Sequence, residues 1–178
     1  MAQVSKRVRD VVRARLAAAW ATKLNLTKAG YSLAAAELAK LAGIDWTGAQ
    51  RKQFFQGQID PNALDDTTAT TYPLVILFTS EASHDGTEKF RSFSGSVLAH
   101  LEFIWTWRQG NALPNFDEVG DLIEDTLLEV FHDRAWVGAI GNGVVYNGEF
   151  AFSRGPVTQA GEHWRQACAA RLRFGVDV

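Results

Sequence analysis

The sequence predicts an α+β fold: a mostly antiparallel or mixed β-sheet with long strands, packed by an N-terminal helix and a central acidic helix. Residues 3–24 and 116–132 repeat apolar side chains every three to four positions, which is the period of an α-helix. Residues 93–107 and 164–178 alternate apolar with polar side chains, which is the period of a strand. A length of 178 residues with 47% hydrophobic content fits one soluble domain.

The first helix, 3–24, has one apolar stripe, and its other faces are basic. Between Met1 and Lys28, seven Lys or Arg residues stand against Asp10, a net charge of +6, although the whole chain carries only −2. The overall charge excludes a bulk polybasic binder of nucleic acid. The local charge is either a solvated helix face or a surface for an acidic partner, such as an acidic protein face or DNA phosphates.

A second, alanine-rich helical pattern covers 31–42, where Ser32 is placed to cap the first turn. Residues 43–72 lose this pattern and contain turn-forming Asp, Pro and Asn, so we expect an irregular excursion with one short helical turn near 50–55. We treat 31–69 as a helical and irregular insertion in a single domain that spans the chain.

Strands follow the excursion. Leu74–Phe78 is a continuous apolar run, which is typical of a central strand buried on both faces. The polar stretch Ser80–Lys89 predicts an exposed hairpin loop, after which the chain returns as the long strand 93–107. Alternation places Trp105 and Trp107 on the apolar face of that strand.

The helix 116–132 begins with Asn115 and Glu118, which resemble a capping box. Its segment contains seven acidic residues and no Lys or Arg, more than capping requires. These residues are Asp117, Glu118, Asp121, Glu124, Asp125, Glu129 and Asp133.

The last third of the chain predicts a hairpin and a terminal strand. Asn147-Gly148 between two short apolar runs is a strong hairpin signal. In the strand 164–178, alternation places the single cysteine, Cys168, on the apolar face. Arg165, Arg171 and Arg173 fall on the opposite face.

Motifs for catalysis or metal binding are not found. One cysteine excludes an internal disulfide and any multi-cysteine metal site, and Cys168 is best interpreted as a buried structural thiol. The four histidines (His84, His100, His132 and His163) lack metal-ligand spacing, and the glycine-rich 138–143 is best interpreted as a turn. We therefore expect no enzyme, no cofactor and no metal, and neither a signal peptide nor a membrane span.

The order of the elements carries a family resemblance. A basic amphipathic helix and an irregular excursion precede the strand Tyr72–Leu77, a polar loop and the long strand Phe93–Trp107. An acidic helix, a hairpin and the terminal strand Trp164–Val178 complete the order. In this order the chain resembles the tail terminator (tail completion) proteins of long-tailed bacteriophages, over roughly residues 1–28 and 70–178.

The resemblance implies a structural virion protein of the tail and neck, assembled in the bacterial host cytoplasm. Proteins of this family form a homohexameric ring that caps the head-proximal end of the tail tube, ends tube polymerisation and joins the tail to the head connector. The implied partners are further copies of the chain, the tail tube protein and a head-side connector or stopper protein. DNA passes through the lumen without sequence-specific binding, and neither catalysis nor a membrane is involved.

Three alternatives remain beside a terminator. The first is another neck ring, such as a stopper or adaptor. The second is a nucleic-acid-binding module that uses the basic helix, and the third is a small enzyme without a readable motif. The overall acidity and the lack of a recognition-helix motif count against the nucleic-acid module.

A closed ring needs contacts between two different surfaces of each subunit. We expect the basic and acidic helices to supply them, unless the two helices face each other within one subunit. The interface residues expected are Lys6, Arg7, Arg9, Arg13, Asp121, Glu124, Asp125 and Glu129.

Two further groups extend this hypothesis. Trp105 and Trp107 either pack against a neighbouring subunit, since Trp is common in binding hot spots, or belong to the subunit core. The second group is the arginine face of the terminal strand, which lines a DNA channel, contacts acids of a neighbouring subunit, or is simply exposed to solvent. Its members are Arg165, Arg171 and Arg173.

Overall fold

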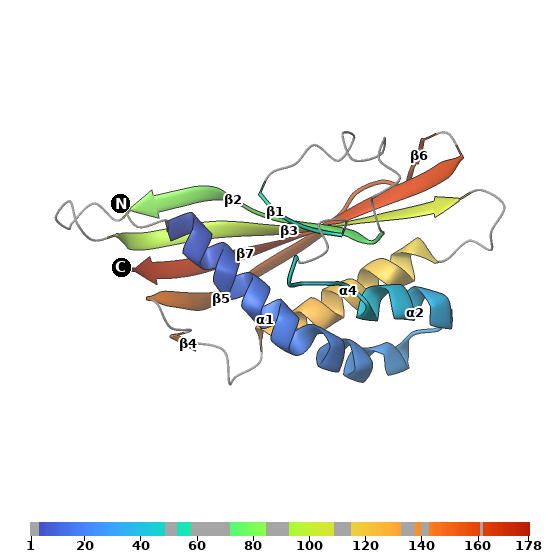
Figure 1. Cartoon of the computed structure of the whole chain (residues 1–178), viewed down its shortest axis with the longest axis horizontal. Coiled ribbons are helices and arrows are strands. Elements are labelled where there is room, and N and C mark those ends of the chain that lie inside the picture. The colour runs from blue at the N-terminus through green and yellow to red at the C-terminus, as the bar shows by residue number, and fades with distance from the viewer. Residues whose placement is uncertain are drawn as a thin grey trace.

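The computed structural model describes residues 4–48, 53–57, 72–84, 93–108, 115–132, 138–139, 143–160 and 162–178. Its helices are α1 (Val4–Thr27), the 3-10 turn η1 (Lys28–Gly30), α2 (Ala35–Ala42) and α4 (Phe116–Phe131). Its strands are β1 (Phe54–Gln56), β2 (Leu74–His84), β3 (Ser94–Arg108), β4 (Gly138–Ala139), β5 (Val144–Arg154), β6 (Thr158–Ala160) and β7 (His163–Asp177). The helices lie on one face of the sheet, which confirms the predicted α+β class (Figure 1).

Within the described ranges, seven strands form one mixed sheet in the order β1-β2-β3-β7-β5-β4, and β6 pairs with β7. Of the described strand pairs, only β1 with β2 is parallel. The centre of the sheet is the antiparallel pair β3 and β7, whose 15 residues each are in register from Ser94 opposite Asp177 to Arg108 opposite His163. The two long strands predicted from alternation are therefore each other's partners.

The apolar stripe of α1 packs on the helix-covered face of the sheet. Trp20 is 1% exposed and lies at the centre of this contact. Its ring stacks on Phe103 of β3 with centroids 5.7 Å apart and meets Trp46 edge-on at 5.1 Å. Its indole N–H donates to the carbonyl oxygen of Leu41 in α2 at 2.8 Å, so the one polar atom of the buried ring has a partner.

Strand β2 confirms the predicted buried run and corrects its boundary. Leu74, Val75, Ile76 and Leu77 are all buried, since the helices cover one face and a small cluster with Ile104 covers the other. The strand then continues through residues 80–84, where a loop was expected, because β3 pairs with it as far as His84. A hairpin signal in a polar stretch does not end a strand whose partner continues.

Two smaller expectations in the first half of the chain are wrong. The turn expected near 50–55 includes Phe54 and Phe55, which belong to strand β1, held by its parallel pairing with β2. Ser32 does not cap α2, whose N-cap position is Ala34. The Ser32 backbone N–H instead donates to the Glu118 carboxylate of α4, so this connection is tied to another helix.

The hairpin predicted at Asn147-Gly148 is also wrong. Residues 144–154 form one strand, β5, which pairs with β7 on both sides of an irregularity between Tyr146 and Phe150. Gly148 has φ of 78°, a left-handed conformation that glycine adopts easily, and this allows the extra residues to bulge out. The local turn signal is real, but the long partner β7 pairs with the chain before and after it.

The buried position of Trp20 gives a stability prediction. Trp20→Ala should lower the free energy of unfolding by about 3–5 kcal/mol, because it leaves a cavity and an unpaired carbonyl at Leu41. Leu26→Ala, on the same helix but with Leu26 66% exposed, is the matched control and should change it by less than about 0.5 kcal/mol. Urea unfolding measures both, and equal effects would contradict the packing described.

Candidate functional site

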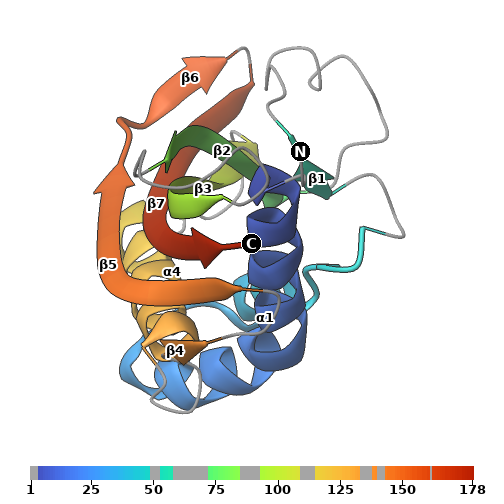
Figure 2. The ribbon, with the colours of Figure 1, turned by 90° about the vertical axis from the view of Figure 1, so that its left-hand side faces the viewer.

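The acidic helix α4 lies beside α1, and other elements of the same chain contact its carboxylates (Figure 2). Lys23 Nζ of α1 is 3.6 Å from a Glu129 oxygen. The Tyr31 hydroxyl, just after η1, donates to Asp125, and burial together with this bond raises the pKa of Tyr31. The alternative in which the helices face each other is thus realised for the second half of α1 and the C-terminal half of α4.

Arg154, at the end of β5, is the residue that sequence reasoning missed. Its guanidinium forms ion pairs with Asp121 and with Glu124, the latter at 2.8 Å. It lies across Gly120, where a Cβ atom would come within 3.1 Å of the Arg154 Nε atom. Burial opposes the charge of Arg154, but the hydrogen bonds that its guanidinium donates to Glu124 and Asp121 raise the pKa of Arg154. The sequence signal for this contact is the helix turn in which three acidic residues surround Gly120, since a glycine there leaves room for an arginine side chain.

The basic N-terminal half of α1 lies elsewhere, over β2 and β1. Arg9 donates to the Thr79 hydroxyl of β2 at 3.0 Å, and Gln56 of β1 donates to Asp10 at 3.3 Å. Lys6 and Arg13 pair with the same Asp10 at 2.7 and 3.9 Å. Burial opposes the negative charge of Asp10. The hydrogen bonds that Lys6 and Gln56 donate to it, together with the positive charges of Lys6 and Arg13, nevertheless lower the pKa of Asp10.

Together, the expected interface residues occupy two opposite flanks of the subunit. The basic flank consists of Lys6, Arg7, Arg9 and Arg13 and adjoins β1 and β2. The acidic flank consists of Asp121, Glu124, Asp125 and Glu129 and includes the carboxylates that Arg154 of β5 contacts. The structure does not bring the two sets together within one subunit.

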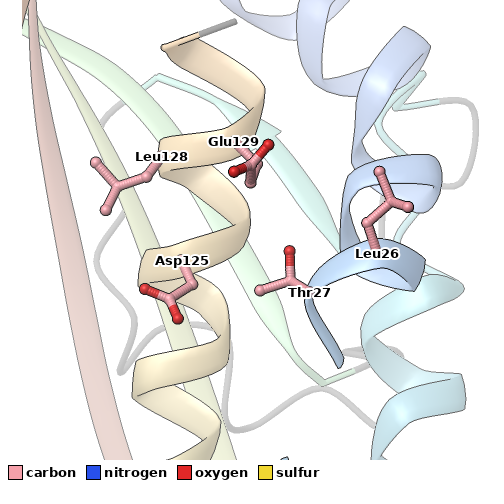
Figure 3. Close-up of a pocket in the computed structure, with 5 residues that line it drawn as sticks. All are labelled: Leu26, Thr27, Asp125, Leu128 and Glu129. Carbon is pink, nitrogen blue, oxygen red and sulfur yellow. The ribbon is translucent and has the colours of Figure 1, made fainter. Parts of the chain in front are cut away.

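A pocket of about 430 Å³ lies between the end of α1 and the acidic helix. Leu26 and Thr27 line one side, and Asp125, Leu128 and Glu129 line the other (Figure 3). Two carboxylates beside two leucines suit a cationic group with an apolar stem. Tyr31 and Lys23 already contact these carboxylates, so the pocket by itself assigns no ligand.

The sheet face opposite the helices carries the three arginines of β7. Arg173 bridges Glu149 at 2.9 Å and the Ser96 hydroxyl at 3.3 Å. Arg165 is half-buried, whereas Arg171 is exposed and pairs across the ladder with His100. Alternation predicted their common face correctly.

His100 on the same face contacts a serine. Ser80 Oγ lies 2.5 Å from His100 Nε2, and the imidazole stacks on Phe78 with centroids 4.8 Å apart. Burial and the charge of Arg171 lower the pKa of His100. A serine–histidine pair begins a nucleophile–base arrangement, but no carboxylate in the described ranges bonds to His100 as the third member.

Trp105 is 4% exposed and belongs to the main core, so it has almost no surface left for a neighbour. This corrects its expected interface role, since the inward face of β3 is already covered by helices. Trp107 pairs through its backbone with Trp164, but its side chain lies outside the described residues.

The described ranges contain neither a metal-binding cluster nor a membrane-spanning helix. No group of three or more His, Cys, Asp or Glu residues there could hold a metal ion. No helix in the described part of the chain has the length and apolar character needed to cross a membrane.

No protein-family model matches the chain, and no curated protein matches its sequence. The resemblance to tail terminators therefore rests on the order and patterning of the elements.

The contacts of Arg154 predict a salt-sensitive link between β5 and α4. Arg154→Met should lower the free energy of unfolding by about 1 kcal/mol at low salt, and the loss should shrink in about 1 M NaCl because ions screen the pairs. Arg171→Met is the control, since Arg171 forms no ion pair with a described residue. A loss independent of salt would contradict the ionic origin.

The buried Cys168 predicts an unreactive thiol. Burial raises the pKa of Cys168 to about 11, so at pH 8 only about 0.1% of the native protein carries the reactive thiolate. Ellman's reagent should react slowly with the native chain at pH 8, faster as the pH rises, and at once after unfolding in urea. Rapid reaction of the native chain at pH 8 would contradict a structural thiol.

Proposed function

We propose that this chain is a structural ring protein of the head–tail joint of a long-tailed phage, a tail terminator that assembles as a homohexamer. In this role it caps the tail tube, ends tube polymerisation and meets the head-side connector or stopper. The observation that carries the proposal is the placing of opposite charges on opposite flanks of one subunit. A ring is built from heterologous contacts, and such flanks attract each other from one copy to the next.

The described contacts support this arrangement. The bond from Arg9 to Thr79 holds the basic flank over β2, whereas Arg154 ties the acidic helix to β5. In the described part of the chain, Lys23 and Arg154 pair with carboxylates of α4, which has six acids and no Lys or Arg. A neighbour's basic flank would supply the missing positive charge.

The proposed role also needs a surface that faces the DNA in the central hole of the ring. The helix-free face of β7 is the candidate surface toward the DNA path, with Arg171 as the exposed cation for sequence-independent contact with phosphates. Another neck ring, such as a stopper or adaptor, would use the same flanks, and binding to purified tube protein separates it from a terminator.

The first test is the state of the purified chain. Light scattering after size exclusion should give about six times the 19.6 kDa of one chain, and negative-stain images should show a ring with a central hole. A chain that stays monomeric at high concentration, with and without tail tubes, would contradict the proposal.

The flanks themselves are tested by charge reversal. Arg9→Glu with Arg13→Glu should abolish ring formation at low salt, because like charges then face each other. Lys28→Glu reverses a charge in η1, directly after the C-terminal end of α1, and should leave the ring intact. Circular dichroism confirms that the variants fold, and unchanged assembly of the double variant at low and high salt would reject the role of the basic flank.

A further inference from the structure

Strand β2 has an open backbone edge over its second half. β3 pairs with β2 from Leu74 to His84, whereas β1 pairs on the other side only with Val75–Leu77. No described strand pairs with residues 78–84 on that outer side. After a bulge between Thr79 and Glu81 the strand is regular again, so its outward N–H and C=O groups are a template for another strand.

Strand β5 has a similar open edge on the opposite side of the sheet. β7 pairs with β5 from Val144 to Arg154, whereas β4 covers only Val145 and Tyr146 on the outer side. Among the described strands, none pairs with residues 150–154 there. Among the described strands, the sheet therefore ends in two open edges, one at each side.

The directions of these two edges are compatible. β2 pairs antiparallel with β3, β3 with β7, and β7 with β5, so β2 and β5 run in opposite directions. A second copy placed beside the first in the same orientation brings its β2 antiparallel to β5. Antiparallel pairs form the straighter and slightly more stable ladder.

We propose that β2 residues 78–84 of one copy add as an antiparallel strand to β5 residues 150–154 of the next copy. The inference rests on the ring proposed above and names the surface that builds it. Because the two edges differ, the contact is heterologous, and repeating it closes a ring when the rotation from one copy to the next divides a full turn.

The charges agree with this pairing independently of the backbone. A sheet continued from copy to copy keeps both helix layers on the same side. The basic flank adjoins β2, where Arg9 contacts Thr79, and the acidic flank adjoins β5, where Arg154 contacts Asp121 and Glu124. Joining the edges therefore brings the basic flank of one copy against the acidic flank of its neighbour, whereas joining two β2 edges would oppose like charges.

Cysteine pairs test the contact directly. Ser83 and Ser153 are exposed and pair with Ser96 and Ala169, which places both on the helix-free face. Within one chain β3 and β7 separate them by roughly 14 Å or more, beyond the reach of a disulfide. Mild oxidation of Ser83→Cys/Ser153→Cys should give a ladder of disulfide-linked multimers on a non-reducing gel.

Register and specificity need two companion pairs. Ser83→Cys with Ala151→Cys covers a register shifted by two residues on the same face. Ser83→Cys with Ala169→Cys is the control, since Ala169 lies on the interior strand β7 and should give no ladder. The native Cys168 is buried and does not compete.

A proline in the open edge is the second test. The Val75 N–H bonds to the Gln53 oxygen at 2.7 Å, so helix-face residues of β2 direct their backbone outward. Ala82 pairs with Val97 and shares that face. Ala82→Pro should therefore remove an outward donor and abolish the ring without breaking a bond to β3, whereas Ala82→Val should keep it.

The outcomes of these experiments distinguish a failure of edge pairing from a failure of the proposed ring function. Loss of rings in Ala82→Pro with an unchanged melting temperature, together with the ladder, supports edge pairing. Rings that persist in Ala82→Pro, with no ladder from either edge pair, overturn edge pairing and leave the ring protein standing. A wild-type chain that stays monomeric with and without tail tubes overturns both.

Discussion

The pairing of β3 with β7 is the interaction on which the rest of the structure depends. Fifteen residues of each strand are in continuous antiparallel register, about three times the usual strand length. β2 attaches to one side of this pair, and β5 and β6 attach to the other. Their inward side chains form the apolar floor on which α1 and α4 pack. Removing this ladder would leave both helices without a surface to cover.

The acidic residues of α4 both tie this helix to the rest of the subunit and give the subunit an acidic surface. Lys23, Tyr31 and Arg154 hold its carboxylates from three different parts of the chain, which fixes α4 on the sheet. Two of these partners, Lys23 and Arg154, are cations, whereas α4 has six acids and no Lys or Arg, so the described contacts leave the helix acidic. The same residues thus tie α4 to the rest of the subunit and define the acidic flank.

Local signals failed where a distant partner outweighed them. Asn147-Gly148 is a strong turn signal, yet the adjoining segments pair with β7 and not with each other. The polar residues 80–84 favour a loop, yet β3 keeps them in a strand. Arg154 shows the same limit at the candidate site, because its carboxylate partners are 30 and 33 positions away in the chain. Sequence patterns describe neighbours along the chain, and these contacts join residues far apart in it.

The sequence by itself determined the two long helices, the long strands β3 and β7, which of their side chains face the core, and which segments carry the opposite charges. These properties follow from periods of 3.6 and 2, which depend only on the spacing of residues along one segment. The tertiary structure alone decided the order of the strands, the two open edges and the opposite placing of the charged flanks. Those features depend on which segments meet in space, and the pairing of β3 with β7, roughly 70 residues apart in the chain, sets that arrangement.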